Sequence, residues 1–180
     1  MGSTKYPNEA DYSDHLQSHG GYCNAYTEFE WTNYQLECNY SGLRKALDMA
    51  ANNFASPLLA KDSMDREINA IESEFKMCFP DDNVRILQIL MSNTAEKGHV
   101  FNRFPWGNLK SLKGSNPDSL MDDLKKFYDD YYSAERIRLV VQVKTQDNLE
   151  ELTQWVTESF SIIQNKGLGL QDFSRYGRTG

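Results

Sequence analysis

Apolar residues recur at helical spacing along most of the chain, and this pattern predicts six helices. The predicted helices cover residues 8–19, 41–56, 65–75, 81–91, 116–131 and 147–163. Gly20 and Gly21 predict the end of the first helix. Ser41 is the predicted cap of the second helix and Pro57 its end. Asn116–Pro117 and Asp147 predict the starts of the last two helices.

The third predicted helix has one apolar stripe with two carboxylates beside it. The stripe consists of Met64, Ile68, Ile71 and Phe75. Glu67 and Glu74 are seven residues apart, so they lie on nearly the same helical face at the edge of the stripe. Carboxylates at the edge of a buried surface are costly unless a cation meets them. The pattern alone favours a solvated charged flank, because Glu is a good helix former.

Alternation of apolar and polar residues predicts three strands, at residues 23–27, 34–38 and 136–143. Residues 28–31 connect the first two as a hairpin. In the third strand, Ile137, Leu139, Val141 and Val143 are expected to share one face. These elements predict an α+β fold with helices packed on a mostly antiparallel sheet. Three strands are few for six helices, so we expect this sheet to be incomplete.

Length and charge narrow the class of protein. The chain has 180 residues, and we expect one domain over residues 1–165 followed by a Gly-rich linker or tail over residues 166–180. The formal net charge is −7 and no Lys/Arg cluster occurs, which argues against a nucleic-acid partner. No apolar run is long enough to span a bilayer, so we expect no membrane partner.

The three cysteines are Cys23, Cys38 and Cys78. Their number is odd and no C-x-x-C occurs, which argues against a disulfide scaffold and against a cysteine zinc site. We expect reduced, mostly buried thiols in a cytoplasmic protein.

Two other stretches carry candidate chemistry. His15 and His19 are four residues apart, the spacing of two zinc ligands on a helix. No Glu stands between them, so the pattern favours two histidines exposed at a helix end. Asn24 and Ala25 lie in a predicted strand whose edge could pair with an extended peptide, although an ordinary hairpin explains the same residues.

Five stretches together resemble a known family. They are "MGSTKYP", "GGYCNAYTEFEWTNYQ", "DREINAIESEF", "NRFPWGN" and "YYSAERIRLVVQ". In this order they resemble the first catalytic domain of the pitrilysin/insulin-degrading enzyme family, most closely its nardilysin branch. The resemblance covers the chain from Met1 to about Gly169.

That family consists of inverted-motif zinc peptidases, in which a helix carries H-x-x-E-H. The resemblance implies that Glu74 is the third zinc ligand and that Glu67 is a neighbouring carboxylate that orients the ligands. It also implies that Asn24 and Ala25 belong to the strand that pairs with the substrate backbone. Zinc is then the cofactor of the complete enzyme. The implied partners are peptide substrates, with the remaining domains of a full-length peptidase or an active partner subunit.

The sequence departs from the family at one decisive place, because it contains no H-x-x-E-H. In the family this motif lies a few residues before the position of Met1. Two explanations compete. The chain is a portion of a nardilysin-like zinc metalloendopeptidase, and so an incomplete domain of that family, or it is a genuinely short protein that has lost catalysis. We expect the isolated chain to be inactive and to bind no zinc tightly, since catalytic zinc takes three protein ligands. The alternative function is a non-catalytic peptide-binding or assembly module.

Overall fold

A computed structural model of the chain describes residues 2–94, 97–113, 119–144 and 149–172. The chain divides into two compact units. The first contains Met1–Glu28, Thr32–Leu59 and Lys125–Leu170, and the second contains Phe29–Trp31, Ala60–Leu124 and Gln171–Gly180. Helix α6 (Leu120–Tyr131) begins in the second unit and ends in the first.

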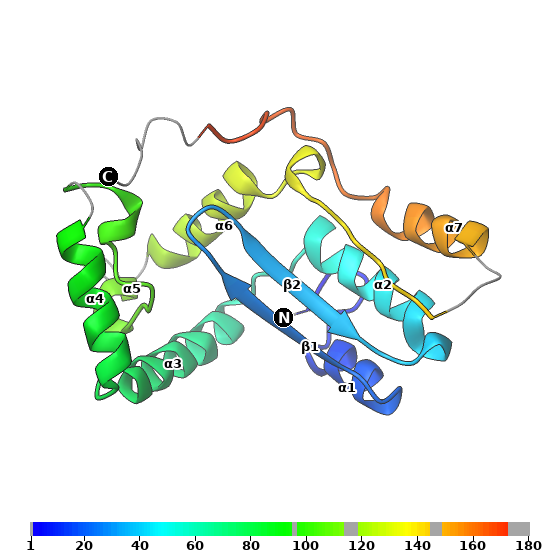
Figure 1. Cartoon of the computed structure of the whole chain (residues 1–180). Helices are drawn as coiled ribbons and strands as arrows, with labels where there is room; N and C mark the ends of the chain where they lie inside the picture. Colours follow the sequence, from blue (N-terminus) through cyan, green and yellow to red (C-terminus); the bar gives the residue numbers. More distant parts are fainter. Residues whose placement is uncertain (1, 95–96, 114–118, 145–148, 173–180) are drawn as a thin grey trace. The chain divides into compact units, whose positions relative to one another are not determined.

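The predicted β-hairpin is present in the first unit. Strand β1 (Tyr22–Thr27) pairs antiparallel with β2 (Thr32–Glu37), and Tyr22 faces Glu37 while Thr27 faces Thr32. Among the described residues these strands form a two-stranded sheet (Figure 1). The α+β class is therefore confirmed, with a small antiparallel sheet.

Helices α1 (Ala10–Ser18), α2 (Tyr40–Ala55) and α7 (Leu149–Phe160) surround the core of the first unit. Helix α2 packs against both α1 and α7. Leu43 and Leu47 of α2 and Leu152 of α7 form the buried cluster. The predicted cap of α2 is wrong, because the N-cap position belongs to Asn39 and Ser41 lies inside the first turn. The predicted starts at Asn116–Pro117 and Asp147 lie outside the described residues.

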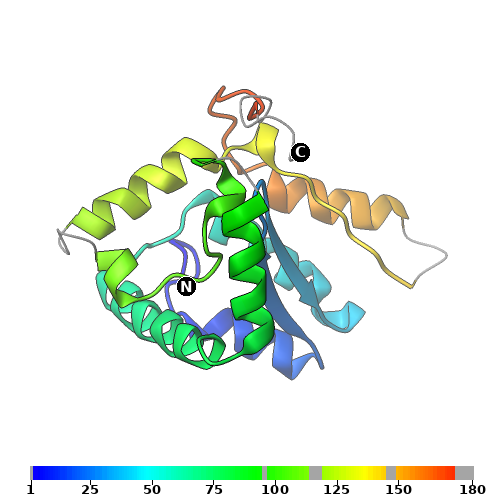
Figure 2. The ribbon, with the colours of Figure 1, turned by 60° about the vertical axis from the view of Figure 1, so that its left-hand side comes forward.

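The predicted strand at residues 136–143 is wrong. The segment after Arg136 is extended but has no strand partner among the described residues, and it runs as a trace without an arrow in Figures 1 and 2. Its side chains do alternate: Val141 and Val143 pack on the core, whereas Val140 is 90% exposed. The predicted face is therefore correct at Val141 and Val143 but wrong at Leu139, which is 42% exposed. A strand also needs a hydrogen-bonded neighbour.

Residues 164–169 return to the end of α6 and are held there by polar contacts. The Arg136 guanidinium donates to the carbonyl oxygens of Leu168 and Gly169 at 2.9 and 2.7 Å. The Glu135 carboxylate accepts from the Leu168 N–H at 2.5 Å. The Lys166 ammonium lies 4.4 Å from the centre of the Tyr128 ring, within range of a cation–π contact. The predicted domain boundary at residue 165 stays a prediction.

The second unit is largely helical. It contains α3 (Lys61–Cys78), α4 (Asp82–Thr94), the short 3₁₀ helix η1 (Val100–Asn102) and α5 (Leu109–Lys113). Helix α5 packs on α3, and η1 packs on α4. Within the described part of the chain, no helix combines the length and apolar character needed to cross a bilayer.

Candidate functional site

Helix α3 carries both predicted site carboxylates on its solvent side. The apolar stripe is confirmed, since Ile68 is buried and Ile71 and Phe75 are half-buried. Glu67 and Glu74 are exposed. Neither carboxylate has a hydrogen bond or ion pair with a residue that the structure describes, so both are available to an incoming cation. The role of Glu74 as a metal ligand stays a prediction.

A third carboxylate on α3, Glu72, was not singled out in the sequence and has a structural role. Its Oε2 accepts a hydrogen bond from the Leu109 N–H at 2.8 Å, and its Oε1 lies 3.3 Å from the Lys76 ammonium. The Leu109 hydrogen bond and then the Lys76 contact lower the pKa of Glu72. Since Leu109 is the first residue of α5, this carboxylate ties α5 to α3. Its spacing in the sequence gave no sign of this bond.

Aromatic side chains hold the same region of α3. Phe75 makes an edge-to-face contact with Phe104, with ring centres 6.0 Å apart. Phe104 also contacts Trp106 at 5.5 Å. The loop containing "FPWGN" therefore packs directly beside Glu74, through the residue that follows it. This packing fixes the helix segment that presents the Glu74 carboxylate.

Strand β1, which contains Asn24 and Ala25, has a free backbone edge. All six of its residues are exposed, and β2 is its sole strand neighbour in the described part of the chain. The Ala25 N–H donates to the Asn24 Oδ1 at 2.9 Å, so it points away from β2. In an antiparallel ladder, the N–H and C=O of one residue point the same way, and this direction alternates along the strand. Cys23, Ala25 and Thr27 therefore direct their backbone groups to the free edge.

The contact between Gly21 and Glu37 agrees with this register. A Cβ on Gly21 would lie 1.8 Å from the Glu37 carbonyl oxygen, so that oxygen faces β1 at its first residues. It is then placed to accept the N–H of Tyr22, its partner in the register. Tyr22 and every second residue after it in β1 therefore pair with β2, and the edge at Ala25 stays open.

The two histidines join α1 to α2. The His15 Nε2 donates to the Gly42 carbonyl at 2.9 Å, and the His19 Nδ1 donates to the His15 carbonyl at 2.8 Å. Their rings lie 4.3 Å apart, and the His19 ring closely approaches Gly42. Both rings are half-buried at this helix contact, so the expectation of two exposed histidines is wrong.

The described residues bring together no group of three or more His, Cys, Asp or Glu that could hold a metal ion. Catalytic zinc takes three protein ligands. The Glu74 carboxylate is exposed, but the described residues do not supply it with the two further ligands of a zinc centre.

The cysteines are free thiols with differing exposure. Cys23 lies on the exposed strand β1, and Cys38 and Cys78 are half-buried, so the expectation of mostly buried thiols is wrong. Burial raises the pKa of the Cys38 thiol, which keeps it protonated and weakly nucleophilic.

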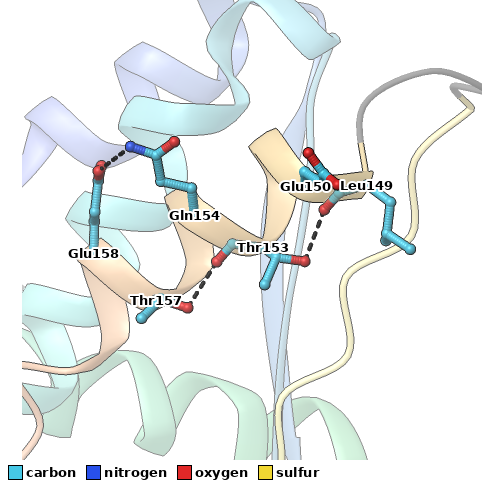
Figure 3. A pocket seen from close by; sticks show the side chains of 6 residues that line it. All are labelled: Leu149, Glu150, Thr153, Gln154, Thr157 and Glu158. Atoms are coloured by element: carbon cyan, nitrogen blue, oxygen red, sulfur yellow. Dashed lines mark hydrogen bonds between the residues drawn. The ribbon is translucent and has the colours of Figure 1, made fainter.

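A shallow depression of about 500 Å³ runs along α7 (Figure 3). The Thr153 and Thr157 hydroxyls that line it donate to carbonyl oxygens of their own helix, each at 2.7 Å. The Gln154 amide donates to the Glu158 carboxylate, also at 2.7 Å. These polar groups are already satisfied within α7, so the depression lacks the convergent polar groups of a ligand site.

Comparison with known proteins assigns the chain to a family. The model of the insulinase family, peptidase family M16, matches residues 1–104. Nardilysin of Rattus norvegicus is 40% identical over 177 residues, which is 97% of this chain and 15% of that protein. A nardilysin-like protein of Arabidopsis thaliana is 41% identical over 167 residues, covering 92% of this chain and 16% of that protein.

A solved structure supports the same assignment. The crystal structure of pitrilysin matches 97% of this chain and 18% of its own, with a TM-score of 0.85 and 32% identity. This chain therefore spans less than a fifth of the length of these relatives. It has the fold of part of a pitrilysin-like domain, and it belongs to the insulinase family, peptidase family M16.

Proposed function

We propose that this chain is a portion of a nardilysin-like zinc metalloendopeptidase. In this proposal, Glu74 supplies one ligand to zinc and Glu67 orients the neighbouring ligands. An extended peptide pairs with the β1 edge at Asn24 and Ala25. The observation that carries the proposal is the agreement of family and geometry: the exposed Glu74 and the open edge of β1 occur in one M16 chain.

Two features of α3 support the role of Glu74. Its carboxylate is exposed and makes no hydrogen bond or ion pair with a residue that the structure describes. The neighbouring Phe75 is held by Phe104, which limits movement of this turn of the helix. A ligand on a rigid element costs less ordering when the metal binds. Glu67 lies two turns away on nearly the same face.

The open edge of β1 supports peptide binding. Ala25 directs its N–H and C=O away from β2, which is the arrangement that an added strand requires. Main-chain hydrogen bonds at such an edge give affinity without strong sequence preference. The chain would thus bind peptides as extended strands, and the zinc of the complete enzyme, with Glu74 as one of its ligands, would polarise the peptide carbonyl.

By itself the chain should not hydrolyse peptides, because the sequence contains no H-x-x-E-H. The test is to incubate the 180-residue chain with zinc chloride and a fluorogenic dibasic peptide, with and without a chelator. We expect no turnover and no zinc retained after gel filtration. Turnover that disappears both with chelator and in Glu74→Gln, but persists in the surface control Asp65→Asn, would refute this expectation.

The alternative function is a non-catalytic peptide-binding or assembly module that associates with an active partner. The open edge of β1 favours it as well, because binding at that edge needs no metal. Sequencing the transcript upstream of the Met1 codon separates the two. An in-frame H-x-x-E-H supports the peptidase, whereas a stop codon there supports the module.

A further inference from the structure

The open edge of β1 is already occupied at one point by the chain itself. The Ala25 N–H donates to the Oδ1 of Asn24, the residue just before it, at 2.9 Å. This N–H is one of the groups that the strand directs away from β2. Neighbouring Tyr22 and Tyr26 are 57% and 45% exposed, and β2 is the sole strand neighbour of β1 among the described residues.

We propose that the Asn24 carboxamide caps the β1 edge, and that an incoming peptide strand must displace it from the Ala25 N–H. This inference rests on the proposed function, in which the same edge binds extended peptide. Asn24 belongs to the strand that the peptide contacts, and in addition its side chain lowers the affinity of the β1 edge for the peptide.

The physical reason lies in the hydrogen-bond balance at the edge. A peptide carbonyl that binds the Ala25 N–H replaces a hydrogen bond already made to Asn24. The peptide therefore gains less at this point than it would at an N–H bonded only to water. Unprotected strand edges also pair with one another, and proteins commonly block them. The cap lowers peptide affinity and at the same time protects β1 from pairing with a second copy of β1.

Three variants isolate the cap. Asn24→Ala removes the acceptor oxygen, and Asn24→Asp keeps an acceptor at the same position. Gln35→Ala is the matched control, because Gln35 faces Asn24 across the hairpin and carries the same amide group. In the described structure the Gln35 carboxamide makes no hydrogen bond to the free edge of β1. Well-dispersed amide spectra of each ¹⁵N-labelled variant establish that it is folded.

The first readout is amide hydrogen exchange in the free chain, which needs no peptide. We expect Asn24→Ala to speed exchange at Ala25 by about threefold to tenfold, the value of one net neutral hydrogen bond. Exchange at Cys23 and Thr27 should stay unchanged, and Gln35→Ala should leave all three amides as they were. Equal exchange at Ala25 in Asn24→Ala and in the original chain would overturn the cap.

The second readout is binding of an acetylated, amidated hexapeptide of alternating Thr and Val, followed by amide shifts of β1. We expect Asn24→Ala to bind this neutral peptide about threefold to tenfold more tightly, and Gln35→Ala to bind it like the original chain. Asn24→Asp should not tighten binding. If the original chain binds and Asn24→Ala binds equally or more weakly, the cap is refuted while peptide binding stands. If no variant binds, peptide binding at this edge is refuted, and the exchange at Ala25 still decides the cap.

Discussion

The contact between α1 and α2 predicts that Gly42→Ala destabilises the protein. Gly42 is buried in the first turn of α2, directly against His19. A Cβ at Gly42 would lie 2.5 Å from the His19 Cγ, 2.7 Å from its Cδ2 and 2.8 Å from its Cβ. All three distances are shorter than real carbon contacts allow. Since the His19 Cβ is attached to the backbone, a change of rotamer cannot relieve the clash completely.

Two opposing effects decide the magnitude. Replacing Gly by Ala inside a helix favours folding by about 1 kcal/mol. Overpacking a buried contact costs about 1–3 kcal/mol. Separating α1 from α2 would also weaken the hydrogen bond from His15 to the Gly42 carbonyl, which is worth about 1 kcal/mol. We therefore expect Gly42→Ala to lower the free energy of unfolding by about 1–3 kcal/mol.

A double-mutant cycle with urea unfolding tests the reasoning. His19→Ala removes the ring but keeps the close Cβ, and His19→Gly removes both. The cost of Gly42→Ala should fall in His19→Ala, and in His19→Gly it should vanish or become a gain of up to about 1 kcal/mol. The same cost in all three backgrounds, or stabilisation by Gly42→Ala alone, would show that the His19 contact does not determine the effect.

Two further predictions concern the first unit. The Asp48 carboxylate accepts hydrogen bonds from Lys5, at 2.7 Å, and from the Tyr6 hydroxyl. Burial tends to raise the pKa of Asp48, but these two hydrogen bonds outweigh it and lower the pKa. Asp48→Asn should therefore cost about 1 kcal/mol at pH 7. This difference should shrink as the pH falls below about 4, where Asp48 binds a proton in the unfolded chain before it does so in the folded one. A difference in unfolding free energy that is constant from pH 7 to pH 3 would contradict this. Leu47→Ala should cost about 2–5 kcal/mol because Leu47 is 2% exposed in the core, whereas Leu149→Ala, at a side chain 76% exposed, should change stability by less than about 0.5 kcal/mol in the same urea assay.

The sequence predicted the local elements because their signals are local. The stripe of α3 and the β-hairpin were predicted correctly, since each depends on residues close together in the sequence. The resemblance to the M16 family was also recognisable from the sequence, because the family motifs are short stretches that occur in a fixed order. The roles that it implies for Glu67 and Glu74 stay predictions.

The tertiary structure decided what the same residues do once distant segments meet. His15 and His19 have the spacing of metal ligands. In the structure, however, His15 donates to the Gly42 carbonyl of α2 and His19 packs against Gly42. Residues 136–143 had the pattern of a strand, yet a strand requires a partner that local sequence does not encode. The cap at Asn24 likewise matters because β2 pairs on one side of β1 and leaves Ala25 on the other. By itself the sequence determined the local elements and the apolar face of α3, whereas the neighbours of these residues depended on contacts between residues far apart in the chain.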